Sequence, residues 1–446
     1  MFVDQDPQAQ FSDLTFSEFV YDLNHPLLKL EKAVHWKNLL DALSQFYSPD
    51  QGRPSTPLRA QAGTLILKHL KKMSDRVVVG YVQESLYAQR FCGLLPGQVL
   101  HYMDPETGLT HFRKTLGEPG MQLIAEVIQS ALRKKPLVKG GKLIVDTTCV
   151  PADILYPTDI RLLERCRREI LSCMQRAKDF GLKTAYRAYS RVARKIFVTF
   201  AKISKPKPKT RKNVHKKMIQ FVRRNLKQLE DLREIATQEL GPQAKTSKRI
   251  LRFLQRLKTS SQKIQIILNQ QKQVYRGRLS IPGRIVSLHK DHVRPIMRGK
   301  FPLSTEFGPK ILVAIYRGWT HVVKVFQNNV PDSSLALATL IWFKRTFGHL
   351  PKELLGDRGL SSRHNELILK SVSVRSGLQP RGNNPLNPKQ KKDIRDRLAI
   401  EARISLAKRM TGWSRLMSRT PSHDHSWIAL DSLAANLRLA FFCNSP

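Results

Sequence analysis

The chain has 446 residues, 41% of them apolar, which is enough for about two or three domains with their own cores. Lysine and arginine number 77 against 35 aspartates and glutamates, giving a formal net charge of +42. Such a charge repels basic partners and attracts polyanions, of which nucleic acid is the most obvious. An RNA-binding protein of ribosomal type and a chromatin-like packing protein remain alternatives.

Membrane and secretory classes are disfavoured. No apolar run approaches the roughly 20 residues of a spanning helix. The N-terminus carries Asp4, Asp6 and Asp13 in place of the basic start of a signal peptide. We therefore expect a soluble cytoplasmic protein without a membrane partner. The cysteines show no CxxC spacing and are odd in number, so we expect buried apolar side chains rather than disulfides or zinc ligands. They are Cys92, Cys149, Cys166, Cys173 and Cys443.

The first 135 residues predict a helical DNA-binding domain. Apolar residues recur at intervals of three and four, as in residues 57–73. Ser74 is a plausible N-cap, and Asp104 begins a further helix that stops at Gly117. Short helices of this kind fit a helix-turn-helix module, and Arg113 and Lys114 are its candidate DNA contacts.

An α/β pattern begins at Lys142. Residues 142–146 form a short apolar run that ends on Asp146, which predicts a buried strand. A strand-rich stretch covers residues 284–330 and includes the segment GRIVSLHK, residues 283–290. A helix over residues 332–346, a strand ending at Asp357 and later helices follow. We expect a mixed sheet flanked by helices, built from residues 140–160 and 276–446.

Residues 161–275 predict a basic helical insertion. Residues 181–272 hold 25 lysines and arginines and four acids. Apolar residues still recur at helical spacing, so a folded segment is indicated. The run Lys205-Pro-Lys-Pro-Lys209 is the expected link between two of its helices. Beyond the sheet, residues 422–446 predict a final helix that packs on the core of the sheet domain through Trp427, Leu430 and Leu437.

Two acids follow apolar strands in a chain that has few acids. Asp146 and Asp357 each end a predicted strand, where their side chains can enter one cleft at a sheet edge. Hard divalent cations that act on phosphodiesters require carboxylate ligands of this kind. A single aspartate at a strand end is more often a turn or capping residue, and that alternative stays open.

A third acid lies on the predicted helix around residues 397–408. Arg397, Glu401 and Lys408 fall on one face, and Leu398, Ile404 and Leu406 are expected to anchor the helix. The spacing also fits an ordinary ion pair between positions 397 and 401 on a solvated helix.

These features resemble the DDE transposases of bacterial insertion sequences, in the groups named after insertion sequences five and four. The resemblance rests on Asp146, Asp357 and the spacing Arg397-x3-Glu401-x6-Lys408. Further blocks that resemble the family are residues 52–79, 104–117, 145–167, 292–310 and 354–365. The family signature often carries a tyrosine three residues before the arginine, where this chain has Ile394.

The resemblance implies a catalytic domain of the ribonuclease-H-like fold in which Asp146, Asp357 and Glu401 bind two Mg²⁺ ions, for which Mn²⁺ could substitute. It also implies that Arg397 and Lys408, and with them Arg358, contact DNA. The implied activity is cutting of double-stranded DNA at the ends of a mobile element and joining of the 3′-hydroxyl ends to target DNA, by a homo-oligomer associated with the bacterial nucleoid. Two alternatives remain: a catalytically inactive, transposase-derived DNA-binding protein, and a ribonuclease-H-like nuclease without strand transfer.

Overall fold

The computed structural model describes the greater part of the chain and divides it into two compact units. The described residues are 21–48, 56–95, 102–182, 186–278, 280–297, 305–382 and 385–442. One unit joins Met1–Asp153 to Ile296–Pro446, and the other is Ile154–Pro295. Each unit has its own apolar core.

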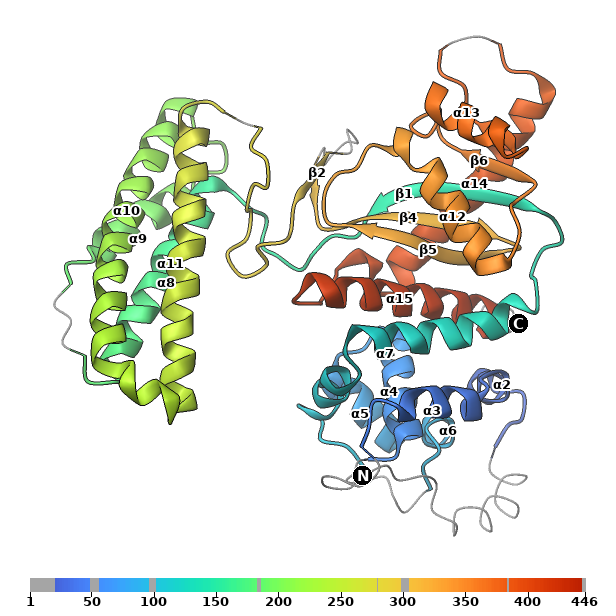
Figure 1. Cartoon of the computed structure of the whole chain (residues 1–446), viewed down its shortest axis with the longest axis horizontal. Coiled ribbons are helices and arrows are strands. Elements are labelled where there is room, and N and C mark those ends of the chain that lie inside the picture. Colours follow the sequence, from blue (N-terminus) through green and yellow to red (C-terminus); the bar gives the residue numbers. More distant parts are fainter. Residues whose placement is uncertain are drawn as a thin grey trace. The chain divides into compact units, whose positions relative to one another are not determined.

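A mixed five-stranded sheet forms the centre of the first unit (Figure 1). Its order is β5-β4-β1-β6-β7. The strands are β1 (Lys142–Cys149), β4 (Lys310–Tyr316), β5 (Trp319–Phe326), β6 (Glu353–Gly356) and β7 (Arg375–Leu378). β4 is antiparallel to β1 and β5, whereas β1, β6 and β7 run parallel. A smaller two-stranded sheet pairs β2 (Pro295–Met297) with β3 (Thr305–Phe307). The predicted mixed sheet flanked by helices is confirmed.

Helices cover both faces of the large sheet. α12 (Ala336–Phe347) and α13 (Arg363–Ser371) pack on the face that carries Leu143 and Val145 of β1. α14 (Pro388–Met410) and α15 (Pro421–Phe441) pack on the opposite face, which carries Ile144. Successive residues of a strand face opposite sides, so each residue of β1 can be assigned to one of these two layers.

Six helices of the N-terminal part pack together and against α15. They are α2 (Pro26–Ala33), α3 (Trp36–Ser44), α4 (Leu58–Lys71), α5 (Asp75–Glu84), α6 (Leu86–Phe91) and α7 (Gly108–Arg133). The predicted cap is confirmed, because the Ser74 hydroxyl accepts from the amide of Val77 at 3.3 Å. Gly117 (φ +59°) is a kink inside α7 rather than the end of a helix.

α15 connects the N-terminal helices to the sheet. Its Leu430, Leu433 and Leu437 are buried in the core of the N-terminal helices, whereas Ile428 and Ala435 belong to the core beneath the sheet. Leu430 and Leu437 therefore pack on the N-terminal helices rather than on the sheet domain, so that expectation is wrong for these two residues. Trp427, which is partly buried, does pack against the core beneath the sheet. The helix lies between α7 and the sheet in Figure 1.

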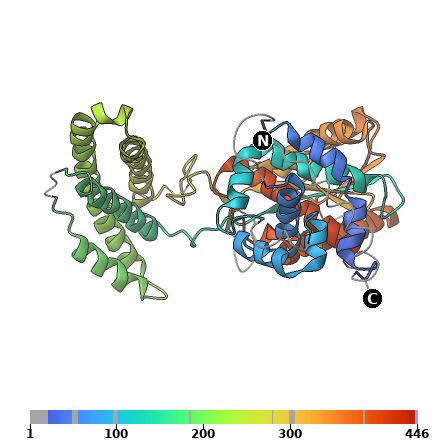
Figure 2. The ribbon, with the colours of Figure 1, turned by 90° about the horizontal axis from the view of Figure 1, so that it is seen from below.

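The second unit is a bundle of long helices (Figures 1 and 2). It contains α8 (Asp159–Lys178), α9 (Ser190–Ala201), α10 (Pro208–Leu240) and α11 (Lys248–Tyr275). α9 ends before the Lys-Pro-Lys-Pro-Lys run and α10 begins within it, as predicted. Polar pairs also lie inside the bundle, such as the bidentate contact between Arg167 and Glu164 at 2.7 and 2.8 Å.

Two further sequence expectations for local structure are wrong. Residues 283–290 form no strand, because Ile285 and Leu288 pack into the core of the helical bundle instead of pairing with a sheet. Leu398 does not anchor its helix: it is 52% exposed, and Ile400 and Ala407 are the fully buried side chains on that helix. The cysteines at 92, 149, 166 and 173 are buried and form no disulfide within the described residues, and Cys443 lies outside those residues. Among the described helices, none is both long and apolar enough to cross a membrane.

Candidate active site

The register of two parallel strands brings Asp146 and Asp357 to equivalent positions. β1 and β6 pair up to Ile144 opposite Leu355. Each aspartate lies two residues beyond that last pair and therefore on the same face as Ile144 and Leu355. This is the face covered by α14 and α15. The two carboxylates consequently meet where β6 ends and β1 continues alone beside β4.

Burial and like charge act together on Asp146. Its side chain is 18% exposed. Desolvation, followed by the negative charge of Asp357, raises the pKa of the Asp146 carboxyl to about 6. The backbone amide of Thr147, which donates to Oδ1 of Asp146 at 2.7 Å, and the charge of Arg397 oppose the rise only partly. The site therefore holds negative charge that nearby cations do not fully offset.

Arg397 links Asp146 to the third predicted acid. From α14 its Nη1 lies 3.8 Å from Oδ2 of Asp146, and its Nη2 donates to Oε1 of Glu401 at 2.8 Å. The ordinary ion pair between positions 397 and 401 is thus present, and it extends to the strand. Glu401 is 51% exposed. In the described part of the chain, no three Asp, Glu, His or Cys side chains are close enough together to hold a metal ion.

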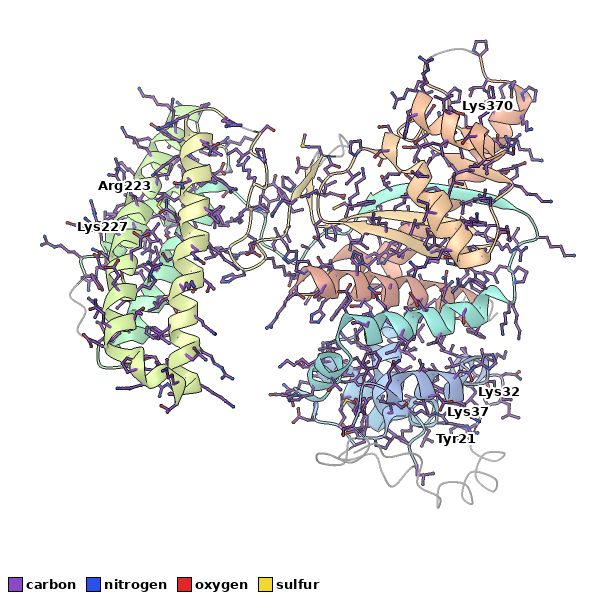
Figure 3. The ribbon with its side chains drawn as sticks, in the orientation of Figure 1. Tyr21, Lys32, Lys37, Arg223, Lys227 and Lys370 are labelled. Carbon is purple, nitrogen blue, oxygen red and sulfur yellow. The ribbon has the colours of Figure 1, made fainter. Side chains whose placement is uncertain are left out.

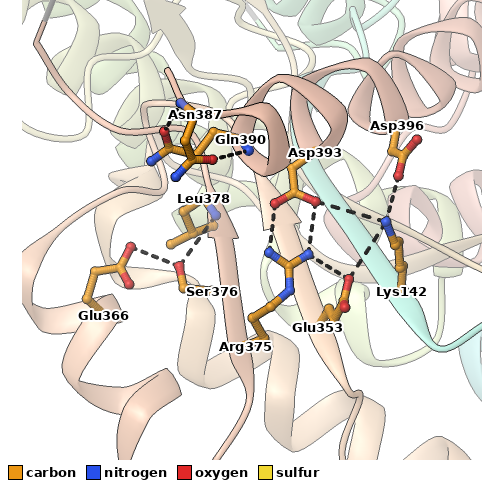
Figure 4. A network of polar contacts seen from close by, with 10 residues as sticks. All are labelled: Lys142, Glu353, Glu366, Arg375, Ser376, Leu378, Asn387, Gln390, Asp393 and Asp396. Carbon is orange, nitrogen blue, oxygen red and sulfur yellow. Dashed lines mark hydrogen bonds and ion pairs between the residues drawn. The ribbon is translucent and has the colours of Figure 1, made fainter. Parts of the chain in front are cut away.

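A network of charged residues fixes the first half of α14 against the sheet (Figure 4). Arg375 of β7 donates to both oxygens of Asp393, at 2.7 and 2.9 Å, and to Glu353 of β6 at 2.6 Å. Lys142 of β1 binds Asp396 at 2.7 Å. These contacts join three strands to α14 within the turn that precedes Arg397. They therefore fix where the side chains of Arg397 and Glu401 lie relative to the sheet.

The start of the same helix is closed by a capping box. The Asn387 side chain accepts from the amide of Gln390 at 2.8 Å, and the Gln390 side chain accepts from the amide of Asn387 at 3.0 Å. The reciprocal pair satisfies amides that would otherwise lack helical partners. It is visible at the top of Figure 4.

The other predicted DNA contacts are spread over unit 1. Arg113 is only 14% exposed, and its Nη1 donates to Asp75 at 3.2 Å, so it is engaged inside the N-terminal helices. Lys114 and Arg358 are exposed, and Lys408 is partly exposed. Arg358 follows Asp357 directly, which places it beside the acids, whereas Arg113 and Lys114 belong to α7.

Sequence reasoning missed the role of Asp332 at this site. Asp332, just before α12, accepts from Thr147 of β1 and pairs with Lys310 of β4. The charge of Asp332 also raises the pKa of Asp146. A turn sequence such as Asp-Ser-Ser looks like a helix start, so the signal that could have singled out Asp332 was weak.

Comparisons with known proteins show two similarities, one of them in the N-terminal part. Residues 14–115 match a family described as Transposase domain (DUF772). The chain is also 31% identical over 175 residues to "Uncharacterized protein ORF8 in nfe locus" of Rhizobium meliloti, an alignment that covers 39% of this chain and 82% of that protein. No solved structure matches the chain.

Proposed function

Because the chain belongs to the same family as that uncharacterized Rhizobium protein and carries a transposase domain over residues 14–115, we propose that it is a DDE transposase of the groups of insertion sequences five and four. It binds the ends of a mobile DNA element, cuts them by metal-dependent phosphodiester hydrolysis and joins the 3′-hydroxyl ends to target DNA. Asp146, Asp357 and Glu401 are its catalytic carboxylates.

The observation that carries this proposal is the placement of Asp146 beside Asp357. Two acids on adjacent parallel strands face the same layer at equivalent positions. Their mutual repulsion contributes to the raised pKa of Asp146. Carboxylates brought together at such a cost are typical of sites that gain a cation.

Glu401 completes this carboxylate set by leaving its partner Arg397. The pair is a single contact at helical i,i+4 spacing, and Glu401 is 51% exposed. Exposed pairs of this type contribute only about 0.3–0.5 kcal/mol. Attraction of Glu401 to a divalent cation near Asp146 would be stronger than this contact with Arg397. The residues present therefore fit a site that is completed when the metal binds. We assign Mg²⁺ to this site, with Mn²⁺ as a substitute.

Bound divalent cations would supply an activated water and neutralise the leaving oxygen of the phosphodiester. The chain's own residues position the DNA strand. Arg397, released from Glu401, offers a planar group with several donors to a phosphate next to the cut, and Lys408 and Arg358 add charge on either side. The freed 3′-hydroxyl then attacks a phosphate of the target DNA and displaces the 3′-oxygen of the target strand, so that one phosphodiester bond replaces another without a covalent bond between protein and DNA.

The sheet supports assignment to the ribonuclease-H-like fold. Three parallel strands continue into an antiparallel pair, in the order β5-β4-β1-β6-β7. The first strand in the chain is central, and the acids lie on it, after the adjacent parallel strand and on the helix that follows the sheet. A site with an exposed glutamate at a sheet edge also suits a long, stiff substrate.

DNA contacts outside the site are assigned to both units. We propose that the N-terminal helices recognise the element ends and that the bundle of α8 to α11 holds the strands by charge. Phosphate contacts carry no sequence information, which fits a surface made of many lysines and arginines. Two or more copies acting on paired ends would complete the assembly.

The proposal is tested with DNA that flanks the protein's own reading frame. Purified protein is incubated with labelled fragments of this DNA and a supercoiled plasmid in Mg²⁺, and both nicked fragments and fragments joined to plasmid are measured. Cutting at defined ends followed by joining is the expected result. Cutting without joining favours a nuclease, and binding without cutting favours an inactive DNA-binding protein; either outcome contradicts the proposal.

A further inference from the structure

Asp332 lies on the opposite side of β1 from Arg397. Thr147 has the same orientation as Val145, which faces α12 and α13, whereas Asp146 faces α14. Asp332 is the first residue of the short helix η3 (Asp332–Ser334) that precedes α12. The segment of β1 that holds Asp146 and Thr147 is therefore contacted from one side by Arg397 and from the other by Asp332.

The contacts of Asp332 form a continuous path to Asp146. The Thr147 hydroxyl donates to Oδ1 of Asp332 at 3.1 Å. The amide of the same threonine donates to Oδ1 of Asp146 at 2.7 Å. Asp332 thus fixes the side chain of the residue whose backbone holds the Asp146 carboxylate.

Asp332 also reaches the second acid. A β-carbon added at Gly359 would lie 3.1 Å from Oδ2 of Asp332 and 3.2 Å from Oδ1 of Asp357. These two oxygens therefore border the same space beside Gly359, which a larger residue would fill. Oδ1 of Asp357 meanwhile accepts from the amide of Leu360 at 3.1 Å, which fixes that carboxylate from the loop side.

Lys310 offsets the additional negative charge. Its Nζ lies 2.6 Å from Oδ1 of Asp332 and donates to the carbonyl of Val330 at 2.7 Å. Lys310 is only 8% exposed, so the pair is shielded from solvent and its geometry is restricted. A paired lysine allows a third aspartate to stand next to two others.

We propose that Asp332, held by Lys310, is a positioning residue that orients Asp146 through Thr147 and keeps Asp357 in place beside it, and so sets the affinity of the site for its divalent cation. This inference rests on the proposed function. Residues that orient metal ligands commonly change metal affinity by about 10- to 100-fold when they are removed.

The test uses three variants of the full chain and Mn²⁺ as the probe. Asp332→Ala removes the acceptor for Thr147. The double variant Lys310→Met with Asp332→Asn removes both charges and retains an acceptor oxygen. Asp153→Asn, which alters an aspartate paired with exposed Arg415 at 2.6 Å, is the control. Free Mn²⁺ is titrated by electron paramagnetic resonance, and cutting is measured against Mg²⁺ concentration.

Asp332→Ala is expected to weaken Mn²⁺ binding about tenfold or more and to shift cutting to higher Mg²⁺, with cutting largely restored at saturation. The double variant and the control are expected to stay within about threefold of the unaltered protein, because a hydrogen-bond acceptor is enough to orient Thr147. Equal losses in Asp332→Ala and the double variant would overturn the inference by making Asp332 a ligand. A lowered melting temperature in Asp332→Ala with unchanged Mn²⁺ affinity would overturn it too. An unaltered protein that neither binds Mn²⁺ nor cuts DNA would instead overturn the proposed function, and the inference with it.

Discussion

The guanidinium of Arg397 lies 3.8 Å from the carboxylate of Asp146, across the gap between helix α14 and strand β1. The same group holds Glu401 at 2.8 Å. Arg397 thus contacts two of the acids, Asp146 and Glu401, that the proposed metal would bind. In the protein without metal, Arg397 is expected to offset part of this negative charge, and the protein with metal is expected to release this arginine to the DNA.

Replacing Asp146 by Asn is expected to stabilise the protein in the absence of metal. The pKa of Asp146 is raised to about 6, so the folded state binds this proton more tightly than the unfolded chain does. Its contribution to stability therefore falls as pH rises from about 4 to about 6 and stays low above that range. At pH 7.5, chemical denaturation should show a gain of about 1–3 kcal/mol for Asp146→Asn, since each unit of pKa shift is worth about 1.36 kcal/mol. A loss of stability would contradict the assignment of repulsion at this site.

Arg375→Met is expected to destabilise the protein by about 2–3 kcal/mol, because hydrogen bonds between charged groups contribute about 1.5–3 kcal/mol and the partner Asp393 is buried. The same change should reduce cutting by freeing the first half of α14. Urea denaturation and cutting rates measure the two effects. Arg415→Met is the control, since Arg415 is 68% exposed in its pair with Asp153 and should change stability by less than about 1 kcal/mol. Equal effects of the two variants would contradict the role given to the network.

Neutralising Arg223 and Lys227 is expected to weaken DNA binding without regard to sequence. Both are exposed on α10, one helical turn apart (Figure 3). If both bind phosphates, the plot of log affinity against log salt has a negative slope to which each of them contributes. Changing them to Ala makes this slope less steep by about 0.9 for each phosphate that is no longer neutralised. Binding measured at several salt concentrations checks the slope, and a melting curve checks the fold. The control variant, Arg223→Lys with Lys227→Arg, keeps a positive charge at both positions and should retain the slope. An unchanged slope in the Ala variant would remove this face from the DNA path.

His321 is expected to make the protein sensitive to acid. Burial, followed by the charge of Arg133, lowers the pKa of His321 to about 3, and its Nε2 has no hydrogen-bond partner among the described residues. The folded state thus excludes a proton that the unfolded chain accepts below about pH 6.5, so stability is present above that pH and falls as pH decreases. His321→Phe keeps a ring beside Trp342 and Phe347. Between pH 6 and 4, the free energy of unfolding of this variant should fall less steeply than that of the unaltered protein, by up to about 1.4 kcal/mol per pH unit. Denaturation at several pH values checks the slope, and exposed His364→Gln is the control. Parallel pH profiles for His321→Phe and the unaltered protein would contradict the prediction.

Much of the fold follows from local sequence signals. Ser74 caps its helix and β1 begins at Lys142, as predicted, because a capping hydroxyl and an apolar run act over a few residues. The strand predicted to end at Asp357 ends one residue earlier, at Gly356, whereas β1 continues past Asp146 to Cys149. The relation between Asp146 and Asp357 could be expected but not fixed, since it depends on a register of β1 and β6 that the sequence does not display.

Features that depend on distant packing were not predictable. The segment of residues 283–290 has the apolar content of a strand. It forms no strand, and its Ile285 and Leu288 pack into the core of the helical bundle. The helix that carries Leu398 buries Ile400 and Ala407 most deeply. These residues lie two positions after Leu398 and one after Leu406, which were expected to be buried. Asp332 was missed because its partners, Thr147 and Lys310, are remote in sequence.

The most direct test of the central claim compares Asp146→Asn, Asp357→Asn and Glu401→Gln with the unaltered protein in cutting of the flanking DNA with Mg²⁺, while DNA binding and melting temperature are measured on the same samples. We predict that each variant binds DNA and remains folded but cuts at least about 100-fold more slowly, as expected when a group that stabilises charge at the reacting phosphate is lost. Cutting that survives any one of these substitutions would contradict the assignment of that residue to the catalytic set.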